Sequence, residues 1–408
     1  MKIASFFTVA TAILSIASAL PATVSKTSPP PRGFSVSLER NKNFKQNTRA
    51  ELTMLNKRYP ALQLTHRFQF LSHLRNAAGS SGTVPVMNHP RDVEYYGTIT
   101  VGTPGQTLKM NFDTGSSDTW FASTNCSTSA CVGHTQFDSS KSSTFKYDGR
   151  AWQIEYGDGS YASGFLGSDI VSVGGISVRQ AVGLSTEESD EFITSPEDGL
   201  FGLGFNSLHS VETVTTFMDN AMAANLLSQP IFSVFLPSVR GNGGVNGEYL
   251  FGGINNAHYT GPLTYVPLSK QTYWQVAIEG VNVNTKSLGK RSQGIIDTGT
   301  TLVIVDSATA MAIHSSVPGA SKTADGWTVP CSLQNSGSSG KVSFKMGGKF
   351  FDVPFADLAY DNISSDRCYS GIQDGSESLW ILGDVFIKNN YCVFDQGQAR
   401  IGIAPIKY

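Results

Sequence analysis

Two stretches of the sequence are versions of one phrase: Met110–Ser117 (MNFDTGSS) and Gly294–Thr301 (GIIDTGTT). This repetition is the strongest indication of the fold. Each is a short apolar run, typical of a strand, that leads into Asp-Thr-Gly and a hydroxyl residue. A single Asp-Thr-Gly is most often an ordinary turn, because Asp and Gly favour turns for separate reasons. Two copies in matching contexts are far rarer, and they indicate an internal repeat.

A second shared phrase follows each copy. Gly199–Leu203 (GLFGL) lies downstream of the first, and Trp380–Asp384 (WILGD) lies downstream of the second. The interval from the Asp of the first phrase is 89 residues to Gly202 and 86 residues to Gly383. Duplication of one structural unit explains these near-equal intervals better than chance does.

Two such units, packed about a pseudo-twofold axis, would bring Asp113 and Asp297 together. Two carboxylates at hydrogen-bonding distance cannot both ionise easily, so they share a proton over a wide acidic range. The pair then offers one base and one acid. The base removes a proton from a water held between the carboxylates, and the acid protonates the oxygen of the attacked peptide carbonyl.

The residues beside each Asp are suited to support it. Ser116 and Thr300 are placed to hydrogen-bond the carboxylates and to fix their orientation. Gly115 and Gly299 allow the backbone to approach the carboxylates closely, because Gly has no Cβ. The mechanism needs neither a covalent intermediate nor a cofactor or metal, and we expect neither.

Composition sets the fold class. The chain has 408 residues, of which 40% are hydrophobic and 15% charged, so it can bury a core and is not disordered. This length suits two or three domain-sized units. Its 41 Gly, with turn residues between short β-branched runs, favour an all-β protein.

Charge divides the chain into a basic leader and an acidic body. Up to Asn88 there are 11 Lys and Arg against two acids, and the remainder carries 19 bases and 30 acids. An acidic body does not attract nucleic-acid phosphates. Its composition suits a protein that acts at low pH, where many of its carboxylates lose their charge. We interpret residues 20–88 as a pro-segment, with a flexible tail as the alternative.

The first 19 residues have the pattern of a secretory signal peptide. An apolar run from Ile3 to Leu20 contains the small-residue cleavage pattern Ala17–Ala19. A transmembrane anchor is the alternative, but the run is short and holds several Ser and Thr. We expect a secreted protein without a membrane anchor, or alternatively a vacuolar one. The sequons at Asn125 and Asn362 then permit N-glycosylation.

Five cysteines lie in the exported body, where disulfides are permitted. Cys126 and Cys131 are close enough for a small loop, and Cys331 and Cys368 could close a longer one. Cys392 lies in an apolar strand pattern, which predicts a buried free thiol. The spacings match neither a zinc site nor a reactive cysteine, so a cysteine protease is not favoured.

Together these residues resemble the pepsin-like aspartic proteases, in particular the secreted fungal rhizopuspepsin-type acid proteases. The resemblance covers nearly the whole chain after Val84. The motifs that carry it are Val93–Gly97 (VEYYG), Val101–Pro104 (VGTP), Asp113–Trp120 (DTGSSDTW), Tyr156–Ser160 (YGDGS), Asp297–Leu302 (DTGTTL) and Ile381–Asp384 (ILGD).

The resemblance implies a bilobal all-β fold with a peptide cleft between the lobes, an N-terminal lobe at 89–236 and a C-terminal lobe at 237–408. Asp113 and Asp297 would be the catalytic pair, and Thr114 and Thr298 would bond across the lobes. It also implies disulfides Cys126–Cys131 and Cys331–Cys368. We expect a monomer that acts on polypeptides.

A flap over the substrate is implied for Tyr156, Gly157 and Asp158, with Trp120 packed behind Tyr156. On the residues alone, a Tyr before Gly-Asp-Gly is more often a strand residue entering a tight turn, and Trp120 a core aromatic. Our hypothesis is that Asp158 helps to accept Lys or Arg before the scissile bond, beside bulky apolar residues. A solvated turn Asp is the alternative.

Two residues depart from the family pattern. Asn111 stands where some rhizopuspepsin-type members have Asp, and Thr119 replaces the usual apolar residue before Trp120. Neither touches the expected catalytic pair, but the loss of a carboxylate at Asn111 weakens the argument for basic specificity.

The opposite charges of leader and body predict attraction at neutral pH. We expect Lys57 or Arg58 to reach the two aspartates and block the cleft. Acid would weaken the attraction by protonating carboxylates, and the enzyme would then remove its own leader. Two other classes remain as alternatives: an inactive homologue that binds peptides or carbohydrate, and a plain β-sandwich binding module.

Overall fold

The computed structural model describes residues 34–40, 95–156, 160–238, 247–335, 340–375 and 378–407. All of them belong to the unit Pro31–Tyr408. The expected signal peptide 1–19, the expected pro-segment 20–88 apart from 34–40, and the flap-tip residues Gly157 and Asp158 lie outside the described residues. Within the described part, no helix has the length and apolar character needed to cross a membrane.

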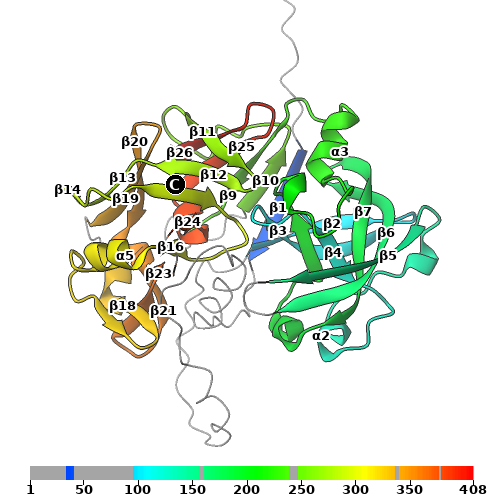
Figure 1. The fold of residues 1–408 in the computed structure, drawn as a ribbon, viewed down its shortest axis with the longest axis horizontal. Coiled ribbons are helices and arrows are strands. Elements are labelled where there is room, and N and C mark those ends of the chain that lie inside the picture. Colours follow the sequence, from blue (N-terminus) through cyan, green and yellow to red (C-terminus); the bar gives the residue numbers. More distant parts are fainter. Residues whose placement is uncertain are drawn as a thin grey trace, which may run out of the picture. The chain divides into compact units, whose positions relative to one another are not determined.

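The first half of the repeat is built from seven strands (Figure 1). They are β2 (Tyr95–Val101), β3 (Gln106–Asp113), β4 (Thr119–Ala122), β5 (Lys146–Glu155), β6 (Tyr161–Val173), β7 (Ile176–Glu188) and β8 (Gly199–Gly202). Strand β3 alternates as its sequence predicts, with Leu108, Met110 and Phe112 buried and Lys109 exposed. It pairs antiparallel with β2 and parallel with β8, which places Asp113 opposite Gly202.

The second half repeats this arrangement. Its strands are β11 (Thr264–Gln271), β12 (Trp274–Ile278), β15 (Ser292–Ile296), β16 (Val303–Val305), β23 (Ile372–Asp374) and β24 (Leu379–Leu382). Strand β15 pairs in parallel with β24, as β3 does with β8, and β16 pairs antiparallel with β24, as β4 does with β8. The two shared phrases of the sequence are therefore partner strands in each half, which confirms the internal repeat.

Two further sheets, of four strands each, belong to this half. One contains β13 (Gly280–Val283), β14 (Lys286–Ser287), β19 (Lys341–Met346) and β20 (Lys349–Pro354). The other contains β17 (Ser321–Thr323), β18 (Gly326–Pro330), β21 (Ala359–Asn362) and β22 (Arg367–Ser370).

Strands from distant parts of the chain pair in series between the halves. The series runs from β1 (Phe34–Arg40) through β10 (Gly247–Phe251), β9 (Ile231–Phe235) and β25 (Asn390–Asp395) to β26 (Arg400–Pro405), which pairs with β11. Strand β1, drawn in blue beside β10 in Figure 1, comes from the expected pro-segment. It sets Val36 opposite Tyr249, so part of the leader is a strand of the body's own sheet.

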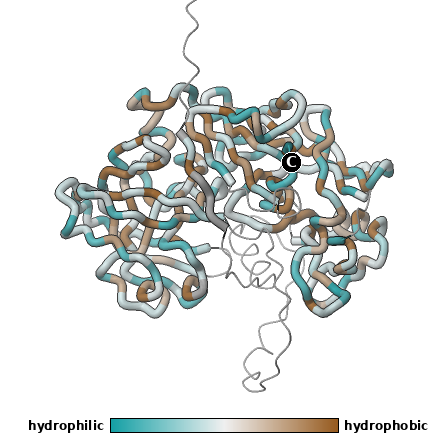
Figure 2. The backbone as a smooth tube through the Cα atoms, turned by 180° about the vertical axis from the view of Figure 1, so that it is seen from behind, coloured by the Kyte–Doolittle hydropathy of each residue, from teal (hydrophilic) through white to brown (hydrophobic). Residues whose placement is uncertain are grey.

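The described helices are short, as an all-β fold requires. They are α2 (Ser129–Val132), α3 (Phe217–Ala223), α5 (Ser307–His314), α6 (Phe355–Leu358) and α7 (Asp384–Ile387), with 3-10 turns η2 (Ser139–Lys141), η3 (Asp190–Thr194), η4 (Asn206–Leu208) and η5 (Cys331–Gln334). Figure 2 shows hydrophobic and hydrophilic stretches in turn along the backbone. The observed architecture confirms the all-β bilobal class.

The cysteines pair as the resemblance implied. Disulfides join Cys126 to Cys131 beside α2 and Cys331 to Cys368 between η5 and β22. Cys392 is free and fully buried in β25, and burial raises the pKa of its thiol far above the ordinary value. It is therefore a core residue and not a nucleophile.

Candidate active site

The two Asp-Thr-Gly loops have the same internal geometry. Asp113 ends β3 and Asp297 follows β15, and both side chains are fully buried. In the first loop the Gly115 N–H donates to Asp113 Oδ1 at 2.8 Å and Ser116 Oγ donates to Asp113 Oδ2 at 2.5 Å. The second loop has the equivalent donors, and they reach the equivalent atoms.

Around Asp297, the Gly299 N–H donates to Oδ1 at 3.0 Å and Thr300 Oγ1 donates to Oδ2 at 2.5 Å. Each carboxylate thus receives at least one backbone donor and one hydroxyl donor. Hydrogen bonds to a carboxylate favour its ionised form and fix its plane. These donors match between the two loops, so they hold the two carboxylates in the same way.

Thr114 and Thr298 join the two loops crosswise. The N–H of each Thr donates to the Oγ1 of the other at 3.0 Å. Thr114 Oγ1 donates to the Ile296 carbonyl at 3.0 Å, and Thr298 Oγ1 donates to the Phe112 carbonyl at 2.7 Å. These bonds link residues 182 to 186 positions apart in the chain, so they fix one Asp loop relative to the other.

The downstream glycines explain why the second phrase is shared. A Cβ on Gly202 would lie 2.6 Å from Ser117 Cα, and one on Gly383 would lie 2.6 Å from the Leu302 carbonyl oxygen. Real Cβ atoms do not approach that closely, so only Gly fits at the end of β8 and directly after β24. This requirement is a packing role that sequence reasoning had not assigned.

Tyr156 lies one residue beyond β5 and is linked to Trp120. The Trp120 Nε1–H donates to the Tyr156 hydroxyl at 2.6 Å, and the ring centroids are 6.5 Å apart. Phe192 of η3 packs edge-on against both rings. Tyr156 N–H donates to the Ser160 carbonyl at 2.8 Å, which closes the base of a hairpin whose tip lies outside the described residues.

A second tyrosine, which sequence reasoning missed, supports the first loop. Tyr249 of β10 is buried, and its hydroxyl donates to the Phe112 carbonyl at 3.1 Å, the same oxygen that accepts Thr298 Oγ1. Burial raises the pKa of Tyr249 well above its ordinary value, so the hydroxyl keeps its proton and remains a donor. The partners are 137 positions apart in the chain, so the sequence held no local signal for this contact.

The two departures from the family pattern lie close to the loop. Asn111 is half-buried on β3, opposite Tyr96 of β2 and Leu200 of β8. Thr119 is buried at the start of β4, and its hydroxyl makes no hydrogen bond within the described residues. No group of three metal-binding side chains occurs in the part of the chain that the structure describes.

Fold and paired Asp loops together define an aspartic protease. The family model described as eukaryotic aspartyl protease matches residues 94–406, and the chain belongs to this family. It is therefore an aspartic endopeptidase. The match confirms the resemblance stated from the motifs.

Curated relatives extend over almost the whole chain. It is 40% identical to rhizopuspepsin-2 of Rhizopus niveus over 395 residues, which cover 96% of this chain and 97% of that protein. It is also 40% identical to syncephapepsin of Syncephalastrum racemosum over 392 residues, or 95% and 96% of the two chains. Pepsin A of Rhinolophus ferrumequinum is 38% identical over 344 residues, or 82% and 86%.

Proposed function

We propose that Asp113 and Asp297 hydrolyse peptide bonds by activating a water between them. One carboxylate acts as general base toward the water, and the other, protonated, donates to the substrate carbonyl oxygen. The observation that carries this proposal is the crosswise Thr114–Thr298 junction between two loops with matching donor sets. A fixed relation between acid and base is what such a mechanism requires.

Asn substitution at each Asp tests the assignment. Asp113→Asn and Asp297→Asn should each abolish cleavage while leaving the folded protein intact, because the amide retains the shape of the carboxylate. Hydrolysis by wild type in ¹⁸O-labelled water should place one label in the new carboxylate, without a burst of acyl-enzyme. Activity in either Asn variant, or a burst phase, would overturn the proposal.

We propose further that residues 20–88 form an inhibitory pro-segment and that the chain is a self-activating zymogen. Support comes from β1, which pairs with β10 over five residues and with β2 over two. Its buried Val36 belongs to the same core as Phe112, the residue before Asp113. Lys57 and Arg58, the residues proposed to reach the aspartates, lie outside the described residues.

Self-activation predicts a specific maturation pattern. At acid pH the wild-type precursor should lose its leader, whereas the Asp113→Asn precursor should remain full length. Maturation of the Asn variant at the wild-type rate, without added protease, would assign the cut to another enzyme. The boundaries at 19, 88 and 236 are part of this proposal, and N-terminal sequencing of the mature protein tests the second of them.

We infer secretion, or alternatively vacuolar delivery, from the leader. The sequon residue Asn362 is exposed at the end of β21, and Asn125 is exposed beside the Cys126–Cys131 disulfide. Both sequons lie near a disulfide, since Asn362 Oδ1 is 2.9 Å from Cys368 Sγ. We propose that Asn362 is the preferred glycan site, because Asn125 directly precedes a disulfide-bonded cysteine in the chain, whereas Asn362 is six residues from Cys368. We also propose that the secreted product is a monomer. Endoglycosidase treatment should lower the mass of the wild-type and Asn125→Gln proteins, and it should leave the mass of Asn362→Gln unchanged.

For specificity we propose bulky apolar residues beside the scissile bond, with Lys and Arg also accepted through Asp158. Asp158 lies outside the described residues, so the support is its position in the flap motif. Asp158→Ala should lower cleavage of Lys peptides relative to Leu peptides. An unchanged ratio would remove Asp158 from the account and leave the catalytic proposal untouched.

A further inference from the structure

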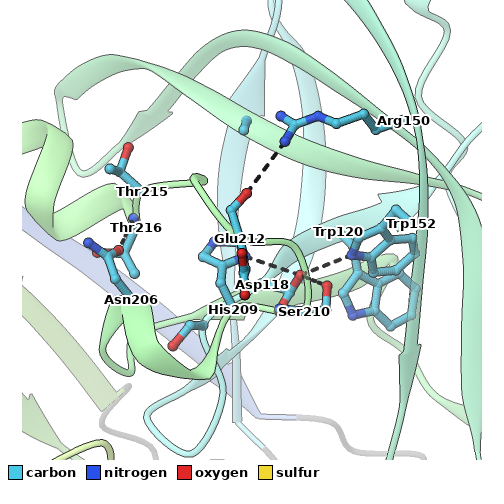
Figure 3. Close-up of polar contacts among 12 residues, drawn as sticks. Asp118, Trp120, Arg150, Trp152, Asn206, His209, Ser210, Glu212, Thr215 and Thr216 are labelled. Atoms are coloured by element: carbon cyan, nitrogen blue, oxygen red, sulfur yellow. Dashed lines mark hydrogen bonds and ion pairs between the residues drawn. The ribbon is translucent and has the colours of Figure 1, made fainter.

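A third buried carboxylate lies close to the catalytic loop. Asp118 connects the loop of Asp113 to β4, and only 2% of its surface is exposed. Burying a carboxylate is costly unless donors satisfy it, so its partners reveal what it holds in place. Figure 3 shows these partners gathered around it.

The donors come from two separate segments. Asp118 Oδ1 accepts the Trp152 Nε1–H of β5 at 3.0 Å and the Ser210 hydroxyl at 2.5 Å, while Oδ2 accepts the Ser210 backbone N–H at 2.9 Å. His209, whose side chain is 4% exposed, places Nδ1 3.3 Å from Asp118 Oδ1. Asp118 therefore fastens the segment after η4 to the strand that leads to Tyr156.

The attachment continues through aromatic contacts to Tyr156. Trp152 packs against Trp120 with centroids 5.8 Å apart, and Trp120 Nε1 donates to the Tyr156 hydroxyl. These three aromatic residues belong to one buried cluster. A rigid body of packed side chains transmits a displacement at Trp152 to Trp120, because interiors have little free volume.

A second contact ties the same strand to the same segment. Arg150 lies two residues before Trp152 on β5, where its side chain is exposed while Trp152 is buried. Its Nη1 donates to the Glu212 carbonyl at 3.4 Å and to the Thr213 hydroxyl at 3.2 Å. Figure 3 shows Arg150 and Trp152 both reaching toward this segment.

The Asp118 carboxylate is suited to keep accepting these hydrogen bonds at low pH. Burial alone would raise the pKa of Asp118, but the contact with His209 and the hydrogen bonds from Ser210 and Trp152 outweigh it and hold the pKa below the ordinary value. Asp118 thus remains an acceptor under conditions in which ordinary carboxylates begin to take up protons.

We propose that Asp118, together with His209 and Ser210, is a positioning group that fixes Trp152 and, through Trp120, holds the Tyr156 hydroxyl in its working place. It acts through these rings and does not touch the substrate. The inference rests on the flap role proposed for Tyr156. Its consequence is that the Asp118 site contributes to turnover from behind the flap.

Steady-state kinetics on the matured enzyme, with active sites titrated by pepstatin, tests this role. Asp118→Asn turns one acceptor oxygen into an amide donor that faces Ser210, so kcat should fall about tenfold with little change in KM. Ser210→Ala removes one donor only, and kcat should fall about two- to fivefold. It remains informative if Asp118→Asn does not fold.

Asp198 offers a matched control in the same lobe. It is also buried, and it accepts the backbone N–H groups of Lys109 at 2.8 Å and Thr135 at 2.7 Å; within the described residues none of its hydrogen bonds goes to Trp120, Trp152 or Tyr156. Asp198→Asn should lower the melting temperature about as much as Asp118→Asn does, with kcat unchanged. Equal kcat losses in both variants would reduce Asp118 to a structural residue.

A double-mutant cycle with Trp152→Phe tests the route. In the Trp152→Phe background, Asp118→Asn should lower kcat by less than twofold, because the link is already cut. Independent, multiplicative losses would overturn the proposal.

Two benchmark variants separate this inference from the proposed function. If Asp113→Asn is inactive and Tyr156→Phe is impaired while Asp118→Asn and Ser210→Ala keep full kcat, this inference alone is wrong. Full activity in Tyr156→Phe would remove the flap role, and full activity in Asp113→Asn would remove the catalytic assignment.

Discussion

His314, the last residue of α5, should make the protein less stable as the pH falls. Its ring is 2% exposed and stacks on Trp327 with centroids 4.3 Å apart. Nδ1 lies 2.7 Å from the Ala310 carbonyl, to which it donates, and Nε2 therefore accepts from the Ser370 hydroxyl at 2.8 Å. Burial lowers the pKa of His314 from 6.5 to about 4.

The sign and size of the effect follow from linkage. Between the two pKa values the unfolded chain binds a proton that the folded protein does not, so stability falls as pH falls. The contribution is complete above the ordinary pKa of 6.5 and is lost as pH falls to about 4. A shift of this size corresponds to about 3 kcal/mol of unfolding free energy.

His314→Gln removes the titration and retains a polar side chain. At neutral pH the variant should be less stable by about 1–3 kcal/mol, because the ring contacts are lost. As pH falls from about 6.5 to 4, the parent should lose about 3 kcal/mol more than the variant, so that the two curves converge or cross.

Urea unfolding at several pH values measures both curves. Both proteins should carry Asp113→Asn, so that self-digestion does not distort the baselines. Parallel curves across this pH range would refute the reasoning, because they would show that His314 takes up its proton equally in both states.

Three further predictions concern the frame around the site. Burial lowers the pKa of His134, but the contact with Glu188 outweighs burial and raises it overall, so protonated His134 stabilises the folded protein below its ordinary pKa and this effect is lost as the pH rises through the raised value. His134→Gln should therefore cost more unfolding free energy at about pH 5 than at about pH 8. An equal cost at both pH values would contradict this. Tyr249→Phe removes one of two donors to the Phe112 carbonyl, so stability should fall by about 1 kcal/mol and kcat/KM by less than about tenfold, as unfolding and kinetics would show. Gly383→Ala forces a Cβ against the carbonyl oxygens of Thr300 and Leu302, so the free energy of unfolding should fall by about 3 kcal/mol or more and turnover should be lost. Gly280→Ala is the control and should be tolerated, because the nearest atom to its Cβ would be 3.7 Å away. Equal effects of the two substitutions would refute the packing argument.

The two Asp-Thr-Gly loops could be predicted from the sequence because their signal is local and duplicated. Asp-Thr-Gly, a hydroxyl residue and an apolar strand are contiguous, and the second copy removes the ambiguity of a single turn motif. The pairing of β3 with β8 and of β15 with β24 then gave the shared downstream phrase a physical reason.

The supporting contacts could not be read in the same way. Tyr249 reaches Phe112 across 137 residues, and Ser210 reaches Asp118 across 92. Neither pair has a spacing or motif of its own, because a side-chain hydrogen bond between distant segments depends on how the sheets pack. The sequence shows Asp118 only as part of a family motif, although in the structure it is a buried carboxylate with several hydrogen bonds.

The basic N-terminal leader shows a different limit of prediction from the sequence. Its charge predicted association with the body, which is a long-range property that composition expresses. The specific pairing of β1 with β10 and β2 depends on an open strand position in the sheet, and a single strand pattern does not reveal its partner.

Cleavage of denatured haemoglobin from about pH 2 to 7, with and without pepstatin, tests the paired-aspartate account most directly. A shared proton between Asp113 and Asp297 predicts activity that is greatest in acid, declines toward neutral pH and vanishes with pepstatin. The same assay on Asp297→Asn should show none. Activity that persists with pepstatin, or in the Asn variant, would contradict the account, and a folded, leader-free wild type without activity would indicate a peptide-binding homologue.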